Sequence, residues 1–362
     1  MDNHGKKSRQ QIIGLLEEHA RLADPSLCRS EADGSVYCLA CAHQCHIKSE
    51  HLGVCRVRYN RNGALYAPGG YVAGLQADPI EKKPFYHVLP GSDALSFGML
   101  GCNFHCDFCQ NWISSQISDS KEMFRHVRIC SAQEIARAAV ACDAPVVVST
   151  YNEPLITADW AAEVFDAAKA EGILCGFVSN GFASREVLQF LRPRMDMFKV
   201  DLKCFSDAGY RTLGGRLQPV LDTIAWLATS GLWLEVVTLV VPGFNDAEAE
   251  LDGIARFLAQ LSPDIPWHVT AFYPNYKLTD RPPTSRALLD RACNAGKNTG
   301  LRYVYAGNMA GQMANREHTF CHACGALLIE RRGFRVLHNQ LRDGRCPACN
   351  AAIPGRWNCA AL

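Results

Sequence analysis

A chain of 362 residues has room for one large catalytic domain with small appendages. Its hydrophobic content of 48%, charged content of 20% and net charge of +1 are ordinary for a globular protein, and they predict no strong attraction to nucleic acid or to a membrane surface. No apolar run approaches the ~18 residues that span a bilayer. Since the N-terminal stretch also lacks the pattern of a signal peptide, we expect a cytoplasmic protein.

Cysteine is the informative residue in the composition, with eighteen copies. Disulfide frameworks of this density belong to small secreted domains, whereas this chain is large. Eleven of the eighteen fall into three groups with the spacing of metal ligands. The other seven are best explained as small apolar residues or surface thiols, and they are Cys28, Cys130, Cys142, Cys175, Cys204, Cys293 and Cys359.

Residues 8–23 are predicted to form an amphipathic helix, because Ile12, Ile13, Leu15, Leu16 and Leu22 recur on one broad face.

The first cysteine group follows this helix and is called here the N-terminal cysteine group. It consists of Cys38, Cys41, Cys45 and Cys55. Four thiols within so short a stretch predict a metal site. Zinc would hold together a segment too small for its own core, whereas an auxiliary iron–sulfur cluster would relay electrons. Unligated cysteines are the remaining alternative.

The second group, called the central cysteine group, follows a predicted strand at Ala94–Leu100 and consists of Cys102, Cys106 and Cys109. Three thiolates on one loop are one ligand short of a closed zinc or iron–sulfur site. An open coordination position is where a metal centre performs chemistry. His105 is the nearby alternative fourth ligand, although a solvated loop residue explains it equally well.

From residue 94 onward, predicted strands and helices alternate with short connections. Strands are expected at Ala94–Leu100, Pro145–Thr150, Ile173–Val178, Asp196–Asp201, Leu232–Val241, Trp267–Phe272 and Leu301–Ala306. Helices are expected from the capping box at Ser131 to Cys142, and at Thr157–Gly172, Ser184–Leu191, Pro219–Ser230, Asp246–Leu261 and Arg286–Gly300. Such alternation predicts an α/β fold with parallel strands, and six such units fit a (β/α)6 partial barrel of the TIM type.

Polar residues follow the predicted strands at their carboxyl ends, where functional groups of parallel barrels gather. Besides the central cysteine group these are Tyr151-Asn152-Glu153-Pro154, Ser179-Asn180-Gly181, Asp201-Leu202-Lys203, Pro242-Gly243-Phe244 and Gly307-Asn308. Tyr273, Asn275, Tyr276 and Lys277 form a polar, aromatic loop suited to a substrate entrance, although a solvated loop explains them equally well.

The third group, called the C-terminal cysteine group, consists of Cys321, Cys324, Cys346 and Cys349. Two Cys-x2-Cys pairs predict a zinc ribbon or a rubredoxin-like module, with zinc favoured and iron as the alternative. We therefore expect an N-terminal helix and cysteine-rich segment at 1–90, a catalytic domain at 91–314 and a four-cysteine ribbon at 315–362.

The central motif, with the aromatic Phe108 before its last cysteine, resembles the cluster loop of the radical S-adenosylmethionine (SAM) enzymes. Gln110-Asn111-Trp112 and the stretch from Asp78 to Pro84 are similar to the AmmeMemoRadiSam-system branch, which is related to the pyruvate formate-lyase activating enzymes. The resemblance extends from about Cys38 to Trp357 and implies the partial-barrel fold. It also implies a [4Fe–4S] cluster on Cys102, Cys106 and Cys109, with SAM on the fourth iron.

The same resemblance implies roles for individual residues. Glu153 stands where the family has Gly-Gly-Glu-Pro, with Tyr151-Asn152 replacing the glycines, and would bind the methionyl ammonium. A helix N-terminal acid is its alternative explanation. The other residues expected at the cofactor are Phe108, Asn111, Asn152, Ser179, Asn180, Asp201, Lys203, Val241 and His268. Val178 departs from the acid common in the activases, and a lone strand histidine such as His268 is equally often a core residue.

The predicted function is reductive cleavage of SAM to a 5′-deoxyadenosyl radical that abstracts hydrogen from an unidentified substrate. Modification of a protein substrate is one option. Activation of a glycyl-radical enzyme is the nearest specific alternative. A zinc-ribbon protein that binds nucleic acid is the alternative from another class, based on five arginines at 331, 332, 335, 342 and 345. Expected partners are a flavodoxin-type or ferredoxin-type electron donor, and a protein substrate or Memo-type and AMMECR-type proteins.

Overall fold

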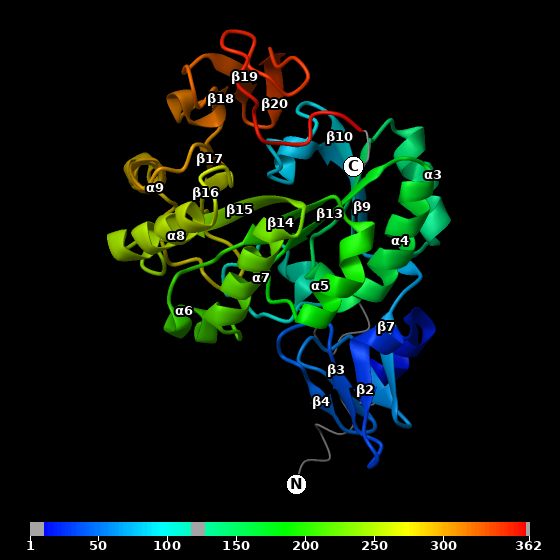
Figure 1. The fold of residues 1–362 in the computed structure, drawn as a ribbon. Coiled ribbons are helices and arrows are strands. Elements are labelled where there is room, and N and C mark those ends of the chain that lie inside the picture. Colours follow the sequence, from blue (N-terminus) through cyan, green and yellow to red (C-terminus); the bar gives the residue numbers. More distant parts are fainter. Residues whose placement is uncertain (1–10, 117–126, 360–362) are drawn as a thin grey trace.

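The computed structural model describes residues 11–116 and 127–359 (Figure 1). At its centre lies an eight-stranded sheet in the order β17-β16-β15-β14-β13-β12-β10-β9. Its parallel strands are β10 (Asp93–Gly98), β12 (Val146–Ser149), β13 (Leu174–Ser179), β14 (Met197–Asp201), β15 (Trp233–Val240), β16 (Trp267–Ala271) and β17 (Val304–Gly307). The sheet is open, because its edge strands β17 and β9 do not pair within the described residues.

Helices connect the successive parallel strands, as the alternation predicted. They are α2 (Trp112–Ser115), α3 (Ala132–Ala141), α4 (Ala158–Ala170), α5 (Arg185–Leu191), α6 (Asp207–Thr212), α7 (Leu217–Thr229), α8 (Glu248–Leu261) and α9 (Arg286–Asn298). The capping box that begins α3 is confirmed, since Ser131 and Glu134 exchange side-chain and backbone hydrogen bonds. Across residues 11–116 and 127–359, no helix has the length and apolar character needed to cross a membrane.

The strands are apolar on both faces, because the sheet is covered on both sides. In β12, Val147 packs into the large core beneath the helices. Its neighbours Val146 and Val148 point to the other face, where they pack with Ile80 and Phe85 from the segment before β10. This segment includes η3 (Ile80–Lys82). Residues that precede the first parallel strand therefore cover part of the second face of the sheet.

One strand of the central sheet was not predicted. β9 (Gly74–Pro79) pairs antiparallel with β10 over six residues. It lies in the stretch 1–90 that was expected to form the N-terminal segment, yet it belongs to the central sheet. The domain boundaries at 90/91 and 314/315 stay predictions.

The N-terminal helix is shorter than predicted. Residues 11–16 are helical, η1 (Glu17–His19) follows, and β1 (Ala20–Leu22) then pairs antiparallel with β7 (Ala64–Pro68). The helix expected over 8–23 is therefore wrong from residue 20, because pairing with a distant strand outweighs a local apolar pattern. Residues 8–10 lie outside the described part of the chain.

Small antiparallel sheets make up the rest of the N-terminal segment. One has the order β1-β7-β6-β5, with β5 at His51–Leu52 and β6 at Tyr59–Arg61. The second has the order β2-β3-β4, formed by Cys28–Ser30, Val36–Cys38 and His46–Ile47. The short helix η2 (Pro25–Leu27) lies between β1 and β2 in the chain. Strand β8 (Tyr71–Val72) pairs with β11 (Arg128–Ile129).

The C-terminal segment forms a three-stranded sheet in the order β18-β19-β20, entered through η7 (Ala314–Glu317). Its strands are Thr319–Phe320, Leu327–Arg332 and Arg335–Asn339. Figure 1 shows this sheet and the sheet of β2, β3 and β4 on opposite sides of the central sheet. The two four-cysteine groups therefore lie far from each other.

Candidate active site

The central cysteine group lies on the loop that leaves the carboxyl end of β10. Gly101 begins this loop with a φ of +97°, and a Cβ there would lie 2.8 Å from Cγ1 of Val57. The loop then turns back on itself, because the Phe104 N–H donates to the sulfur of Cys102 at 3.3 Å and the Cys109 N–H donates to the carbonyl of Cys106 at 3.2 Å. Cys106 is buried, and the other two cysteines are half-buried.

The three thiols lie near one another and near charged side chains. Burial raises the pKa of Cys102, and the charges of Glu153, Cys106 and Cys109 raise it further. Burial also raises the pKa of Cys106 to about 11, although the Lys203 ammonium opposes this rise. The bare thiols of Cys102 and Cys106 are therefore protonated at neutral pH, and a bound metal centre would favour their thiolates.

The structure does not gather these three sulfurs as ligands of a single ion. Among the described residues, the sulfurs found within 4.8 Å of one another are those of the C-terminal cysteine group. The central cysteine group is not found with such a cluster of ligand atoms. A cubane carries each thiolate on a different iron atom, so its ligands are spread more widely than those of one zinc ion. His105 is exposed and points its ring toward Gly214, so nothing brings it to the sulfurs.

Glu153 is buried in the loop after β12, and within the described part of the chain its hydrogen-bond donors are all neutral. Its Oε1 accepts from the Leu155 N–H at 3.0 Å and from Ser179 Oγ at 2.7 Å, and its Oε2 accepts from the Asn180 N–H at 2.8 Å. Burial raises the pKa of Glu153 to about 7, against the lowering effect of these hydrogen bonds. The carboxylate is thus held in place without a cation, and it lies close enough to Cys102 to affect its pKa.

Asn103 is a site residue that the sequence analysis missed. Its Oδ1 accepts from Asn180 Nδ2 at 2.7 Å, and its Nδ2 is buried without a hydrogen-bond partner among the described residues. A buried amide with one free donor is costly unless a ligand accepts from it. The signal available in the sequence was its position directly after Cys102, within the cysteine motif.

Asp201 and Lys203 lie together at the end of β14. The carboxylate of Asp201 accepts from Lys199 Nζ at 2.5 Å and from Lys203 Nζ at 3.4 Å. Burial alone would lower the pKa of Lys203, but the charges of Asp201 and Cys106 raise it, so its ammonium persists beside the central cysteine group. Lys199 was not predicted, because its position inside a strand resembles that of an ordinary charged residue.

The remaining predicted cofactor residues differ in their burial and in the residues they contact. Phe108 packs on Phe244, with ring centroids 5.5 Å apart, which brings the loop after β15 to the central cysteine group. The Val241 N–H donates to Asn245 Oδ1 at 2.7 Å, and Asn245 Nδ2 donates to the Lys203 carbonyl at 2.6 Å. Asn152 is buried and its Oδ1 accepts from the Met99 N–H, whereas Asn111 is exposed at the start of α2.

His268 is not brought to this group. Its Nε2 lies 2.6 Å from Oε2 of Glu235, and its ring stacks on Tyr305 at a centroid distance of 5.1 Å. Glu235 also accepts from the Tyr86 and His87 N–H groups near the amino ends of the strands. The geometry is that of a satisfied core histidine, the alternative that the sequence left open.

The polar loop after β16 contacts the cysteine loop directly. The N–H groups of Lys277 and Leu278 donate to the Asp107 carbonyl at 3.0 and 3.1 Å, and Tyr276 stacks on Trp112. A cavity of about 540 Å³ opens beside it, lined by Gln110 of the cysteine loop, Tyr273, Asn308, Arg332 and Phe334. The cavity has the size of a small-molecule or peptide side-chain site.

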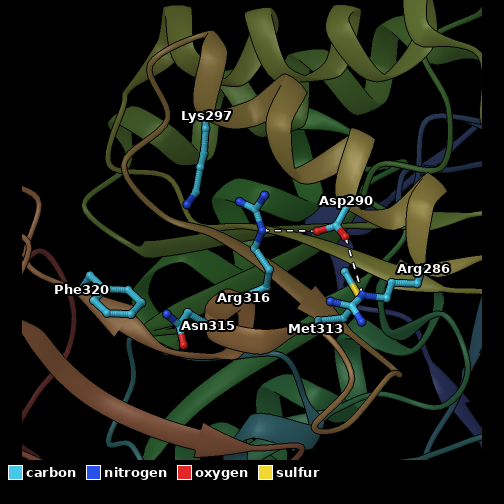
Figure 2. Close-up of a pocket in the computed structure, with 7 residues that line it drawn as sticks. All are labelled: Arg286, Asp290, Lys297, Met313, Asn315, Arg316 and Phe320. Atoms are coloured by element: carbon cyan, nitrogen blue, oxygen red, sulfur yellow. Dashed lines mark ion pairs between the residues drawn. The ribbon is translucent and has the colours of Figure 1, made fainter.

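A second cavity, of about 370 Å³, lies between α9 and the entry to the C-terminal sheet. Figure 2 shows Arg316 between Lys297 and Asp290, with Arg286 on the other side of Asp290. The guanidinium Nε of Arg316 is 3.6 Å from Asp290, and that of Arg286 is 3.9 Å from it. The cavity contains none of the predicted site residues and is not part of the site around the central cysteine group.

The C-terminal cysteine group has the geometry of a site for one metal ion. Its sulfurs lie within 4.8 Å of one another, with 3.6 Å between Cys321 and Cys349 and also between Cys324 and Cys346. A tetrahedral ion with Zn–S bonds of about 2.3 Å holds its sulfurs about 3.8 Å apart. The residues present therefore fit a single tetrahedral ion.

The two halves of this group are built alike. The Cys321 N–H donates to the Ala326 carbonyl, and the Cys346 N–H donates to the Ala351 carbonyl. Each turn contains a residue with positive φ, Gly325 at +74° in the first and Asn350 at +61° in the second. Burial would raise the pKa of Cys346, but N–H groups of Cys349 and Ala348 and the neighbouring thiols lower it to about 7, which favours the thiolate that a metal needs.

Comparison with known proteins gives the class. Residues 98–255 match the family model of the Radical SAM superfamily. The chain is 36% identical over 325 residues to the uncharacterised protein MJ0808 of Methanocaldococcus jannaschii, covering 89% of this chain and 96% of that protein. It is 22% identical over 236 residues to the pyruvate formate-lyase 1-activating enzyme of Escherichia coli, covering 60% and 93%. It is also 25% identical over 167 residues to the choline trimethylamine-lyase activating enzyme of Oleidesulfovibrio alaskensis, covering 46% and 50%.

These findings define the class as an α/β enzyme, with a three-cysteine loop after its first parallel strand. The chain belongs to the radical SAM superfamily and is related to the pyruvate formate-lyase activating enzymes. Membership implies SAM and an iron–sulfur cluster as cofactors.

Proposed function

We propose that Cys102, Cys106 and Cys109 hold a [4Fe–4S] cluster, and that Glu153 receives the methionyl ammonium of SAM beside it. When bound, the cluster and SAM supply reductive cleavage of the sulfonium and a 5′-deoxyadenosyl radical that abstracts hydrogen from a substrate. The open central sheet is of the (β/α)6 partial-barrel type in this proposal, with the site at the carboxyl ends of its strands.

Glu153 carries the proposal. A buried carboxylate that accepts three neutral hydrogen bonds and has a pKa of about 7 is a preformed acceptor for a cation. The helix-capping explanation accounts for the bond from Leu155, but Ser179 and Asn180 come from the next strand and have no part in capping. They position Glu153 toward the sulfur of Cys102, whose pKa its charge affects.

Other residues of the chain complete the site. Lys203 places an ammonium beside Cys106 and compensates part of the negative charge that three thiolates bring. Asp201 remains ionised beside Lys199 and Lys203, because their charges lower its pKa against the effect of burial. Its carboxylate is suited to hydroxyl donors such as those of a ribose. The free Nδ2 of Asn103 supplies one further donor at the site.

The experiment is anaerobic reconstitution followed by assay. The native chain should bind iron and sulfide in equal amounts and form 5′-deoxyadenosine from SAM with a chemical reductant. Glu153→Gln should keep its iron and sulfide but bind SAM more weakly, since the amide has no charge to offer the ammonium. Cleavage of SAM that is unaffected by replacing all three cysteines of the central group would overturn the proposal.

Activation of a glycyl-radical enzyme is the second candidate. It is supported by the similarity to two activating enzymes, and by the cavity of about 540 Å³ beside Gln110, which would receive a peptide segment. Incubation with pyruvate formate-lyase and SAM, followed by electron paramagnetic resonance (EPR), tests it. A glycyl-radical signal supports the candidate, and 5′-deoxyadenosine without that signal favours a different substrate.

Zinc at the C-terminal cysteine group, an electron donor of the flavodoxin or ferredoxin type and Memo-type or AMMECR-type partners complete the proposal. The nucleic-acid alternative is weakened by the arginines themselves. Arg331 is fully buried against Glu81 and Tyr86, so the five arginines do not form one basic surface. Sulfurs at 3.6 Å suit a single tetrahedral ion, and zinc is favoured over iron because a closed four-thiolate site is its common structural use.

A further inference from the structure

The N-terminal cysteine group is formed by two loops that face each other. The Cys38 N–H donates to the Cys45 carbonyl at 2.9 Å, which closes the first loop, and the Gln44 N–H donates to the Cys41 carbonyl at 3.0 Å. Cys55 comes from the second loop, where the neighbouring Val54 N–H donates to the sulfur of Cys45 at 3.5 Å. Cys38, Cys41 and Cys55 are buried, and Cys45 is half-buried.

The four thiols of the N-terminal cysteine group are neighbours of one another. Burial raises the pKa of Cys41, and the charges of Cys38, Cys45 and Cys55 raise it further, so all four are neighbours. Yet within the described chain the sulfurs that gather inside 4.8 Å are those of the C-terminal cysteine group. The N-terminal cysteine group does not repeat this single-ion geometry within the described residues, and its four thiols match the four iron atoms of a cluster in number.

A buried arginine lies beside this group with a free donor. Arg58 is fully buried, its Nε donates to the Ile156 carbonyl at 2.7 Å, and another nitrogen pairs with Asp159. Its Nη1 has no hydrogen-bond partner among the described residues. Burial would lower the pKa of Arg58, but the charges of Asp159, Cys38 and Cys55 raise it. A guanidinium donor left free next to two cysteines is matched by an anionic metal–sulfur centre.

The N-terminal cysteine group packs against the loop that contains the central cysteine group. His43, between Cys41 and Cys45, has its Nε2 3.0 Å from the carbonyl oxygen of Asn103. A Cβ on Gly101 would lie 3.1 Å from the Cys55 carbonyl, so the second loop touches the residue before Cys102. Both loops of the N-terminal cysteine group therefore contact the three-cysteine loop within one residue of its first ligand.

We infer that Cys38, Cys41, Cys45 and Cys55 hold a second [4Fe–4S] cluster, which delivers electrons to the cluster of the central cysteine group. This role rests on the proposed function, whereas the cluster itself does not. A carrier of the flavodoxin or ferredoxin class loses one electron as the second cluster goes from the 2+ to the 1+ state. That cluster then returns to 2+ as the central cluster is reduced from 2+ to 1+, and no bond or proton changes place.

Metal content of the full chain tests the second cluster. After anaerobic reconstitution the native chain should hold about eight iron atoms and eight sulfides, since each cubane has four of each. With Cys102, Cys106 and Cys109 all replaced by Ala, about four iron atoms, four sulfides and the EPR signal of one reduced [4Fe–4S] cluster should remain. A triple variant without iron, holding zinc at the N-terminal cysteine group, would overturn the inference. Native and triple variants with equal iron would instead overturn the proposed function.

A matched pair of variants identifies the ligands. Adding Cys41→Ser to the triple variant should remove the remaining iron. Cys28→Ala should not, because Cys28 pairs with Cys38 across the β2–β3 ladder but directs its thiol to the Pro25 carbonyl. Iron retained with Cys41→Ser, or lost with Cys28→Ala, would contradict the assignment of ligands.

Two reductants test the relay. In the chain that carries Cys41→Ser alone, SAM cleavage driven by reduced flavodoxin should fall at least tenfold relative to the native rate. Cleavage driven by dithionite should stay within about twofold, because a small reductant reaches the central cluster directly. Equal losses with both reductants, or none with flavodoxin, would overturn the relay.

Discussion

The imidazole Nε2 of His43 and the carbonyl oxygen of Asn103 lie 3.0 Å apart, so one hydrogen bond joins the N-terminal cysteine group to the loop of the central cysteine group. A carbonyl only accepts, so Nε2 carries the proton. Burial lowers the pKa of His43, which keeps the ring neutral at pH 7 with Nδ1 unprotonated. The contact is thus a neutral hydrogen bond between loops sixty residues apart in the chain.

Loss of this contact should weaken the attachment of the two loops. His43→Ala is expected to lower the melting temperature of the reconstituted protein by about 1–3 °C, the effect of one net hydrogen bond in a domain of this size. His51→Ala is the control, because His51 bonds locally to the Ser49 carbonyl. Equal melting temperatures for the two variants in a thermal scan would show that the contact adds no stability.

Removal of the central ligands should abolish the chemistry but not the fold. The variant with Cys102, Cys106 and Cys109 replaced by Ala should form no 5′-deoxyadenosine and keep its circular dichroism spectrum. Cys106 is one small member of the large core, and Cys102 and Cys109 pack against it, so the many other residues of that core should keep the fold. The matched control is Cys142→Ala, a half-buried cysteine at the end of α3 that should retain full activity. Product formation by the triple variant would contradict the assignment.

Glu153 should make SAM binding depend on pH. Its pKa of about 7 lies above the ordinary value near 4.5, so the ligand-free site is increasingly protonated as pH falls below 7. An ammonium requires the ionised carboxylate, so affinity should fall by up to tenfold per pH unit from about 7 toward 4.5. For the ligand-free protein the sign is opposite: a raised carboxyl pKa makes the folded state more stable as pH falls through the same range.

The control for this prediction is Glu153→Gln, since the amino group of SAM titrates as well. Calorimetric titrations at pH 6 and pH 8 should show a smaller pH effect for the variant than for the native chain. At pH 8 the variant should bind SAM more weakly by roughly 1.5–3 kcal/mol, the range for a hydrogen bond to a charged group. Matching affinities at pH 8 would return Glu153 to a helix-capping role.

The C-terminal cysteine group should stabilise the fold without taking part in catalysis. The C-terminal segment packs on the central sheet and on the chain before β10: Tyr305 OH of β17 lies 2.9 Å from Thr319 Oγ1, and His87 Nδ1 lies 2.6 Å from the Pro354 carbonyl. Cys324→Ser should therefore release one zinc ion and lower the melting temperature, while dithionite-driven cleavage at low temperature persists. Cys359→Ser, at an exposed cysteine outside the group, should change neither.

The outcome that would contradict this role is iron in place of zinc together with loss of cleavage. A point substitution is preferable to deletion of residues 315–362, because deletion would uncover Tyr86, Glu81 and Tyr305, which are all buried against that segment.

A buried ion pair should hold the C-terminal sheet in place. Nε of Arg331 lies 3.4 Å from Oε1 of Glu81, with both side chains fully buried. Arg331→Met leaves an uncompensated carboxylate and should cost roughly 3–5 kcal/mol of unfolding free energy. Adding Glu81→Leu should recover much of this loss, since removal of both charges also removes the desolvation cost. Arg335→Met, at an exposed strand position, is the control, and chemical denaturation measures all four proteins.

The sequence by itself determined the features that depend on local spacing. Three cysteines within eight residues predict a metal loop, Ser131 and Glu134 three residues apart specify a helix start, and short apolar runs specify buried parallel strands. These are short-range properties, since hydrogen bonds and chelation within a few residues need no distant partner. For this reason the order of strands and helices from Ala94 onward was predicted almost in full.

Only the tertiary structure decided which distant groups meet. It turned residues 20–22 into a strand against β7, added β9 to the central sheet, and paired His268 with Glu235 rather than with the site. It also joined Asn103 to Asn180 and Lys199 to Asp201, and it gathered the sulfurs of the C-terminal cysteine group within 4.8 Å. Each outcome depends on burial between segments far apart in the chain, where desolvation and a matching partner decide the energy of a polar group. The balance between the desolvation of a polar group and its pairing with a distant partner leaves no periodic pattern in the sequence.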